Sequence, residues 1–79
     1  MAPVTDKNIK RSITVAGHRT SITLESAFWD SLREIANERG QSVNVLIAEI
    51  DRQQPENLSS AIRVFVLGHY KAKNAYSRI

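Results

Sequence analysis

The polar and apolar positions of this 79-residue chain change period along its length. Residues 19–24 alternate polar and apolar side chains, which predicts a strand with one buried face. A similar alternating run at residues 11–15 precedes it, and Gly17 stands between the two as a turn residue. The pattern leaves two alternatives. Either the runs form a hairpin within one chain, or residues 11–15 are a flexible flank of a strand that pairs with the same strand of a second copy.

Helical periods follow the second run. A first apolar stripe is centred on Phe28, Leu32 and Ile35, and Gly40 is placed to end this helix in a left-handed conformation. Ser42 is a good N-cap for a second amphipathic helix. After a polar break that contains Pro55, Asn57 or Ser59 can cap a third helix.

The apolar positions of the third helix spread over more than one face. Val64 and Leu67 widen the stripe formed by Ile62, Phe65 and Val66. We therefore expect this helix to be covered on two sides, by its own chain and by a second one. A chain of this length has a small core, and it has no cysteine that could form a disulfide, so oligomerisation is the expected source of added stability.

Charge and composition narrow the classes of partner and chemistry. The net charge is +3, and basic ends flank an acidic middle at residues 25–56, which suits a polyanion such as nucleic acid. Two histidines and no cysteine supply too few ligands for a structural zinc site, so no metal or cofactor is predicted. Paired carboxylates, a nucleophile with its base, and a glycine-rich phosphate loop are not recognisable, so no enzyme activity is expected.

The same pattern gives the domain organisation. We expect a mobile arm at residues 1–9, one domain at residues 10–73 and a short tail at residues 74–79. No apolar run approaches the roughly 20 residues of a membrane span, and no signal peptide pattern opens the chain. A cytoplasmic protein without a membrane partner is the expectation.

The strand that ends at Leu24, the spacing from there to Gly40 and the helix after Ser42 together resemble the ribbon-helix-helix family of DNA-binding proteins. Residues 40–44, Gly-Gln-Ser-Val-Asn, resemble the helix–helix turn of the Arc-repressor branch, and the Ser-Ile-Thr-Leu strand resembles the plasmid copy-control repressor branch. The resemblance implies a mainly α fold with a short β ribbon. It also implies a homodimer, here with an additional C-terminal helix.

Alternation places Ile22 and Leu24 toward the core, so Arg19, Ser21 and Thr23 point outward. The resemblance implies that paired strands enter the major groove of double-stranded DNA and that these three side chains contact bases. Arginine can bind guanine through two hydrogen bonds, and hydroxyls can bond to several base edges.

The resemblance also implies a DNA phosphate contact at the start of the second helix. Backbone N–H groups of Ser42, Val43 and Asn44 have no intrahelical acceptor there, and the helix dipole favours an anion. Lys10 and Arg11 are expected to add phosphate contacts. In an alternative register, the helix that begins near Ser59 forms the clamp, with Ser60 and Arg63. The ungapped spacing from Leu24 to Gly40 favours the first register.

A hairpin in each chain would create a difficulty for this mode of binding. A dimer sheet would then have four strands, whose outer axes lie about 14 Å apart, whereas the major groove is about 12 Å wide. The flank must then separate on binding, or the sheet meets DNA differently, or DNA is not the partner. The alternative function is a protein-interaction module or an antitoxin on the same dimeric scaffold, with a protein partner.

Overall fold

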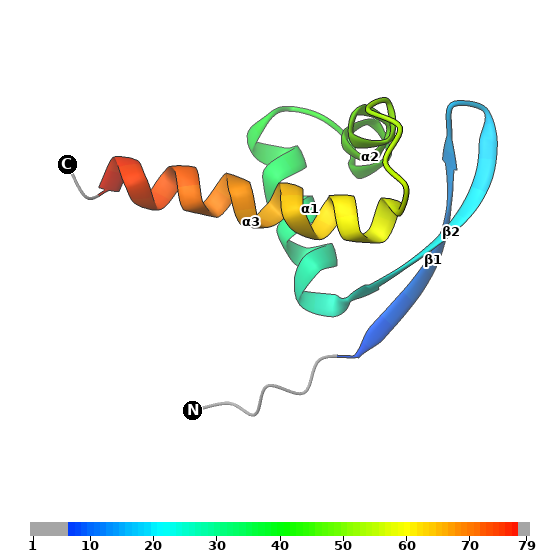
Figure 1. Ribbon diagram of the computed structural model, residues 1–79, viewed down its shortest axis with the longest axis horizontal. Helices are drawn as coiled ribbons and strands as arrows, with labels where there is room; N and C mark the ends of the chain where they lie inside the picture. Colours follow the sequence, from blue (N-terminus) through cyan, green and yellow to red (C-terminus); the bar gives the residue numbers. More distant parts are fainter. Residues whose placement is uncertain (1–6, 78–79) are drawn as a thin grey trace.

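A β-hairpin followed by three helices makes up the fold of the computed structural model, which describes residues 7–77 (Figure 1). The elements in chain order are β1 (Asn8–Val15), β2 (His18–Glu25), α1 (Ser26–Glu38), α2 (Val43–Asp51) and α3 (Leu58–Ser77). The hairpin lies at one end of the molecule, and α3 extends away from it toward the other end. The predicted fold class, mainly α with a short β ribbon and an additional C-terminal helix, is confirmed.

The hairpin alternative is the one that the chain adopts. β1 and β2 pair antiparallel from Asn8 opposite Glu25 to Val15 opposite His18. The two-residue turn has positive φ at both positions, 53° at Ala16 and 79° at Gly17. Positive φ at both central residues is typical of a type I′ turn, whose twist matches that of the strands it joins. The strand at residues 19–24 therefore has a partner within its own chain.

Two elements extend past the expected domain bounds. The arm expected at residues 1–9 overlaps β1 at Asn8 and Ile9, because Ile9 pairs with Leu24 and its carbonyl accepts a hydrogen bond from the Trp29 indole. The tail expected at residues 74–79 is helical as far as Ser77, because no proline or glycine interrupts α3 after Gly68. Residues 1–6 and 78–79 lie outside the described residues.

One apolar core joins the hairpin to all three helices. The inward face of the hairpin packs on α1, α2 and the first half of α3. The core side chains are Ile13, Val15, Ile22, Leu24, Trp29, Leu32, Ile35, Ala36, Leu46, Ile47, Ile50, Ile62 and Val66. Within residues 7–77, no helix is long and apolar enough to cross a membrane.

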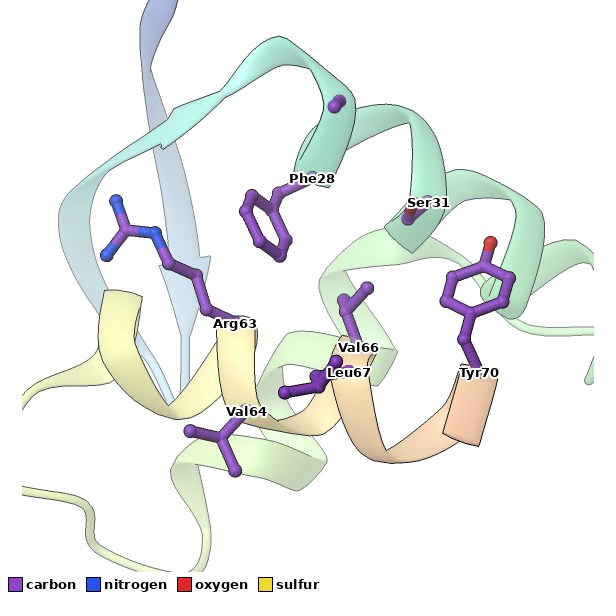
Figure 2. A pocket seen from close by; sticks show the side chains of 8 residues that line it. Phe28, Ser31, Arg63, Val64, Val66, Leu67 and Tyr70 are labelled. Carbon is purple, nitrogen blue, oxygen red and sulfur yellow. The ribbon is translucent and has the colours of Figure 1, made fainter. Parts of the chain in front are cut away.

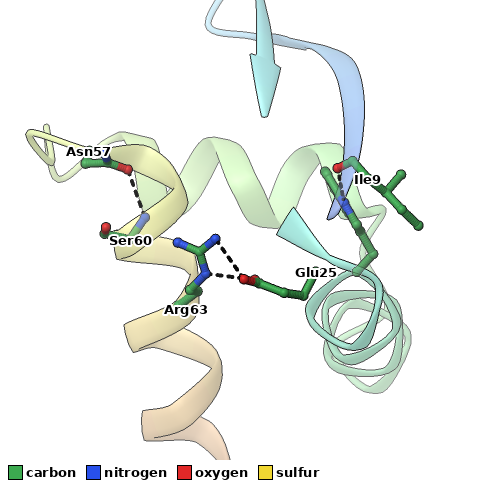
Figure 3. A network of polar contacts seen from close by, with 6 residues as sticks. Ile9, Glu25, Asn57, Ser60 and Arg63 are labelled. Carbon is green, nitrogen blue, oxygen red and sulfur yellow. Dashed lines mark hydrogen bonds and ion pairs between the residues drawn. The ribbon is translucent and has the colours of Figure 1, made fainter. Parts of the chain in front are cut away.

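The helix ends carry the predicted caps. Gly40 has a φ of 66°, its N–H donates to the Asn37 carbonyl at 3.1 Å, and the Gln41 N–H donates to the Ala36 carbonyl at 2.8 Å. These two bonds form a Schellman motif, which satisfies carbonyls at the end of α1. Asn57, rather than Ser59, caps α3, because its side-chain oxygen accepts a hydrogen bond from the Ser60 N–H at 3.0 Å (Figure 3).

Candidate nucleic-acid interface

The outward face of β2 carries the three residues expected to contact bases. Arg19, Ser21 and Thr23 are exposed, whereas Ile22 and Leu24 between them are 2% and 0% exposed. The alternation predicted from the sequence is therefore present in the fold. The three side chains lie together on the face of the hairpin that points away from the helices.

The hairpin as a whole has a positive charge balance. Residues 7–24 include four lysines and arginines and no aspartate or glutamate. The first carboxylate after them, Glu25, accepts a hydrogen bond from Arg63 Nε at 2.9 Å (Figure 3). Because that carboxylate is paired, the base of the hairpin does not oppose the approach of a polyanion.

The two cations expected to contact phosphates lie on opposite faces of the hairpin. Lys10 pairs with Thr23 and is exposed on the outward face. Arg11 pairs with Ile22 on the inward face, where its guanidinium carbon lies 5.5 Å from the centroid of the Trp29 ring. Their positions in the sequence are adjacent, but the period of two in a strand separates them in space.

The start of α2 lies beside Arg11. The Ser42 hydroxyl accepts a hydrogen bond from the Val45 N–H at 3.1 Å, and the first intrahelical bond joins the Leu46 N–H to the Ser42 carbonyl. The N–H groups of Val43 and Asn44 precede that bond, so they are the ones that a helix leaves for an external acceptor.

A surface pocket connects this helix start to the hairpin and to α1. Its lining includes Arg11, Arg33, Val43 and Asn44. The fold thus brings Arg11 together with two of the three predicted α2 residues, and Ser42 is exposed next to them. Arg33, which forms an ion pair with Asp30, was not singled out in the sequence. Its spacing of four from Trp29 was the available signal, because residues at i and i+4 share one helix face.

The alternative clamp near Ser59 has no free arginine. Arg63 pairs with Glu25, and its guanidinium carbon lies 5.9 Å from the centroid of the Phe28 ring. The Ser60 N–H is bonded to Asn57. Arg63 therefore connects α3 to the hairpin and to α1, which favours the register in which α2 meets DNA.

Acidic side chains of α1 connect it to α3. Glu34 accepts a hydrogen bond from the Tyr70 hydroxyl at 2.9 Å, and Glu38 accepts one from Lys73 Nζ at 3.0 Å. The hydrogen bond from Lys73 lowers the pKa of Glu38, and the same bond raises the pKa of Lys73. His69 Nε2 lies 3.7 Å from Glu38. These contacts hold the distal half of α3 against α1.

An apolar groove runs between α1 and α3 (Figure 2). Phe28 and Tyr70 lie along it, together with Val64 and Leu67. Val64 and Leu67 are 69% and 56% exposed. We expected a second chain to cover this side of α3. In the single chain, it is exposed to solvent.

Residues 7–77 contain no group of three or more His, Cys, Asp or Glu side chains arranged to hold a metal ion.

Comparison with known proteins gives two similarities. A family model described as a ribbon-helix-helix domain matches residues 8–70, from the first residue of β1 into α3. A solved structure of an uncharacterized protein from Bordetella pertussis Tohama I is 35% identical, with a TM-score of 0.74 over 92% of this chain. The chain spans 62% of the length of that protein. No protein with a curated function matches.

Proposed function

The chain belongs to the ribbon-helix-helix domain family, and we propose that it is a sequence-specific transcriptional regulator that binds double-stranded DNA as a homodimer. Members of this family are DNA-binding regulators rather than enzymes, and they are usually dimeric. The observation that carries the proposal is the outward face of the hairpin, where Arg19, Ser21 and Thr23 are exposed and the carboxylate that follows them, Glu25, is paired with Arg63. A two-stranded ribbon is one of the elements that the major groove admits.

Arg19 carries most of the proposed sequence preference. An arginine that binds guanine through two hydrogen bonds contributes about 1–3 kcal/mol of discrimination against the wrong base. The hydroxyls of Ser21 and Thr23 contact base edges with less discrimination, because they bond to several bases.

The proposed phosphate contacts flank the ribbon. Backbone N–H groups of Ser42, Val43 and Asn44 hold one phosphate at the positive end of α2. Arg11 lines the same pocket as Asn44, so it adds its charge there. Lys10 approaches the DNA backbone from the outward face of β1.

The second copy is proposed to cover the apolar groove between α1 and α3. A single chain of this size buries a smaller fraction of its surface than a larger domain does, and it has no disulfide, so it gains stability from association. The groove leaves Val64 and Leu67 exposed, and its lining comes from α1 and α3 rather than from the hairpin. Two hairpins of such a dimer would meet two half-sites about one helical turn apart.

The test compares DNA binding by the wild-type protein and by single variants. Sequences selected from a random duplex library supply the site, and gel-shift titration measures affinity. Arg19→Ala is expected to lose about five- to 150-fold of the preference for the selected site over a random duplex. Lys10→Ala and Arg11→Ala are expected to weaken binding to both duplexes alike.

Arg52→Ala is the matched control, because Arg52 is exposed at the C-terminal end of α2 and lies outside the hairpin. The ribbon-reading proposal is wrong if Arg19→Ala leaves both affinity and preference at the level of this control. A wild-type protein that binds no DNA, but copurifies with one protein in fixed stoichiometry, would instead support the interaction module or antitoxin.

A further inference from the structure

Arg33 of α1 has no role in the contacts proposed so far, which come from the hairpin and from the start of α2. Resting on the proposed function, we infer that Arg33 is a further DNA phosphate contact, and that it exchanges its ion pair with Asp30 for a phosphate when DNA binds. Each half of this statement has its own support in the structure and its own experiment.

The pocket that contains Arg33 opens at the free edge of β1. Ser12 lies on the outward face of the hairpin and Ile13 on the inward face, and both line the pocket. A pocket lined from both faces of one strand must wrap around an edge of that strand. One edge of β1 is paired with β2 along its whole length, so the pocket lies at the other edge. It therefore flanks the ribbon, on the side where a bound duplex carries its sugar-phosphate backbone.

The charge of the pocket suits a phosphate. Within the described part of the chain, its lining has two arginines, Arg11 of β1 and Arg33 of α1, and no carboxylate. Trp29 forms an apolar wall, and the Arg11 guanidinium carbon lies 5.5 Å from the centroid of its ring. Stacking uses the face of a guanidinium, so the N–H groups at its rim remain able to bind a phosphate. Two guanidinium groups from different elements thus reach one site.

The ion pair between Arg33 and Asp30 is of a kind that a phosphate can replace. The two residues are three positions apart on α1, and their side chains are 57% and 65% exposed. Water and salt screen an ion pair as exposed as this one, so it is weak. An arginine can bind a phosphate through two parallel N–H···O bonds, which are stronger. Asp30 therefore keeps the Arg33 guanidinium near the pocket in the free protein and releases it to DNA.

The first test measures the affinity of Arg33→Ala and its salt dependence by gel-shift titration with the selected and the random duplex. Binding to both duplexes is expected to weaken by about tenfold. The slope of log affinity against log salt concentration should fall by about one, because one phosphate contact is lost. Arg52→Ala is the control here too, because it removes the same charge from a residue outside the pocket.

The outcomes separate this inference from the proposed function. If Arg33→Ala matches Arg52→Ala in affinity and slope, while Arg19→Ala still relaxes the sequence preference, Arg33 is not a phosphate contact and the proposed function stands. If the wild-type protein binds neither duplex, the proposed function itself fails. Arg33 and Asp30 are exposed, so their variants are expected to fold, and circular dichroism checks that they do.

The second test concerns the exchange of the ion pair. Asp30→Asn is expected to tighten binding by up to about fivefold, because the amide neither holds Arg33 nor repels a phosphate. The gain should be smaller when Arg33→Ala is also present. Glu56→Gln is the control, since it removes the same charge from an exposed residue outside the pocket. An equal gain with and without Arg33 would mean that Asp30 acts by direct repulsion alone, which would overturn the exchange.

The third test locates the phosphate on the DNA. Selected duplexes with one neutral methylphosphonate at successive positions lose one backbone charge at a time. At one position in a half-site, this change is expected to weaken wild-type binding by about tenfold and Arg33→Ala binding by a smaller factor. Arg52→Ala should show the wild-type factor there. Equal losses for the wild-type protein and Arg33→Ala at every position would show that Arg33 contacts no phosphate.

Discussion

Trp29 shows how one residue can connect distant parts of this small fold. It lies beside the predicted apolar stripe of α1, yet it is 3% exposed. Its indole N–H donates to the Ile9 carbonyl, and the Arg11 guanidinium lies over its ring. A tryptophan has an apolar body and one polar group, so a buried one usually packs and hydrogen-bonds at once. Trp29 therefore fixes the start of β1 against α1.

At the residue scale, the hairpin turn gives a prediction whose control variant should change the free energy of unfolding in the opposite direction. Gly17 has a φ of 79°, so Gly17→Ala should cost about 1–2 kcal/mol in the free energy of unfolding through backbone strain. An added Cβ meets no atom within 4 Å, so strain is the cause rather than a clash. Gly68→Ala in α3 also meets no atom, and there alanine should stabilise the helix by up to about 1 kcal/mol. Urea unfolding of both variants measures whether Gly17→Ala lowers the free energy of unfolding while Gly68→Ala raises it. Equal changes in the two variants would contradict the assignment of the turn.

At the scale of elements, ion pairs and hydrogen bonds determine how α3 is held. Arg63 connects the first half of α3 to Glu25 at the end of β2, and Lys73 connects the second half to Glu38 of α1. Glu34 and Tyr70 add a hydrogen bond between these contacts. Glutamates spaced four apart on α1 thus face basic and hydroxyl groups of α3, which relieves the repulsion expected of a like-charge pair.

The contact between Glu38 and Lys73 makes stability depend on pH. Because the hydrogen bond from Lys73 lowers the pKa of Glu38, the folded state favours the carboxylate more than the unfolded state does. The contact between Glu38 and Lys73 therefore stabilises the fold at pH values above the ordinary pKa range of glutamate. This stabilisation is lost as the pH falls through the pKa that Glu38 has in the folded state. The contribution is small, since both side chains are about half exposed.

Glu38→Gln should therefore lower the urea midpoint near neutral pH, and the difference from the wild-type protein should disappear in acid. Glu56→Gln is the control, because Glu56 is exposed and has no ion pair in the part of the chain that the structure describes. A difference that persists at low pH would mean that Glu38 acts through packing instead of charge.

For the whole molecule, the arrangement separates two surfaces with different chemistry. The outward face of the hairpin carries basic and hydroxyl side chains. The groove between α1 and α3 is apolar (Figure 2). The proposed second copy in the groove would leave the outward face of the hairpin free for DNA. Dimerisation is then expected to affect DNA binding only by setting the distance between the two half-sites that the hairpins contact.

The whole-molecule prediction concerns the state of association. Val64→Glu and Leu67→Glu place a charge in the groove, so each should convert the proposed dimer to a monomer in light scattering at micromolar concentration. Val45→Glu is the matched control, because Val45 is 48% exposed on α2 and lies outside the groove. A dimer that survives both α3 substitutions but is lost in Val45→Glu would place the interface on α2.

Features with a local cause could be predicted from the sequence. The outward direction of Arg19, Ser21 and Thr23 follows from the period of two in a strand. The left-handed Gly40 and the Ser42 cap follow from the backbone groups that a helix end leaves unsatisfied. The base and phosphate contacts of these residues stay predictions, because they depend on a bound partner.

Tertiary contacts decided what the local pattern left open. The hairpin forms because the apolar side chains of β1 complete the core, and its pairing with β2 begins two residues earlier than the predicted domain. The strand register then placed Lys10 and Arg11 on opposite faces, and Glu25 engaged Arg63 across 38 positions of sequence. Local periodicity sets the direction of a side chain within its element. Which distant group meets that side chain depends on how the elements pack, and only the folded chain determines this.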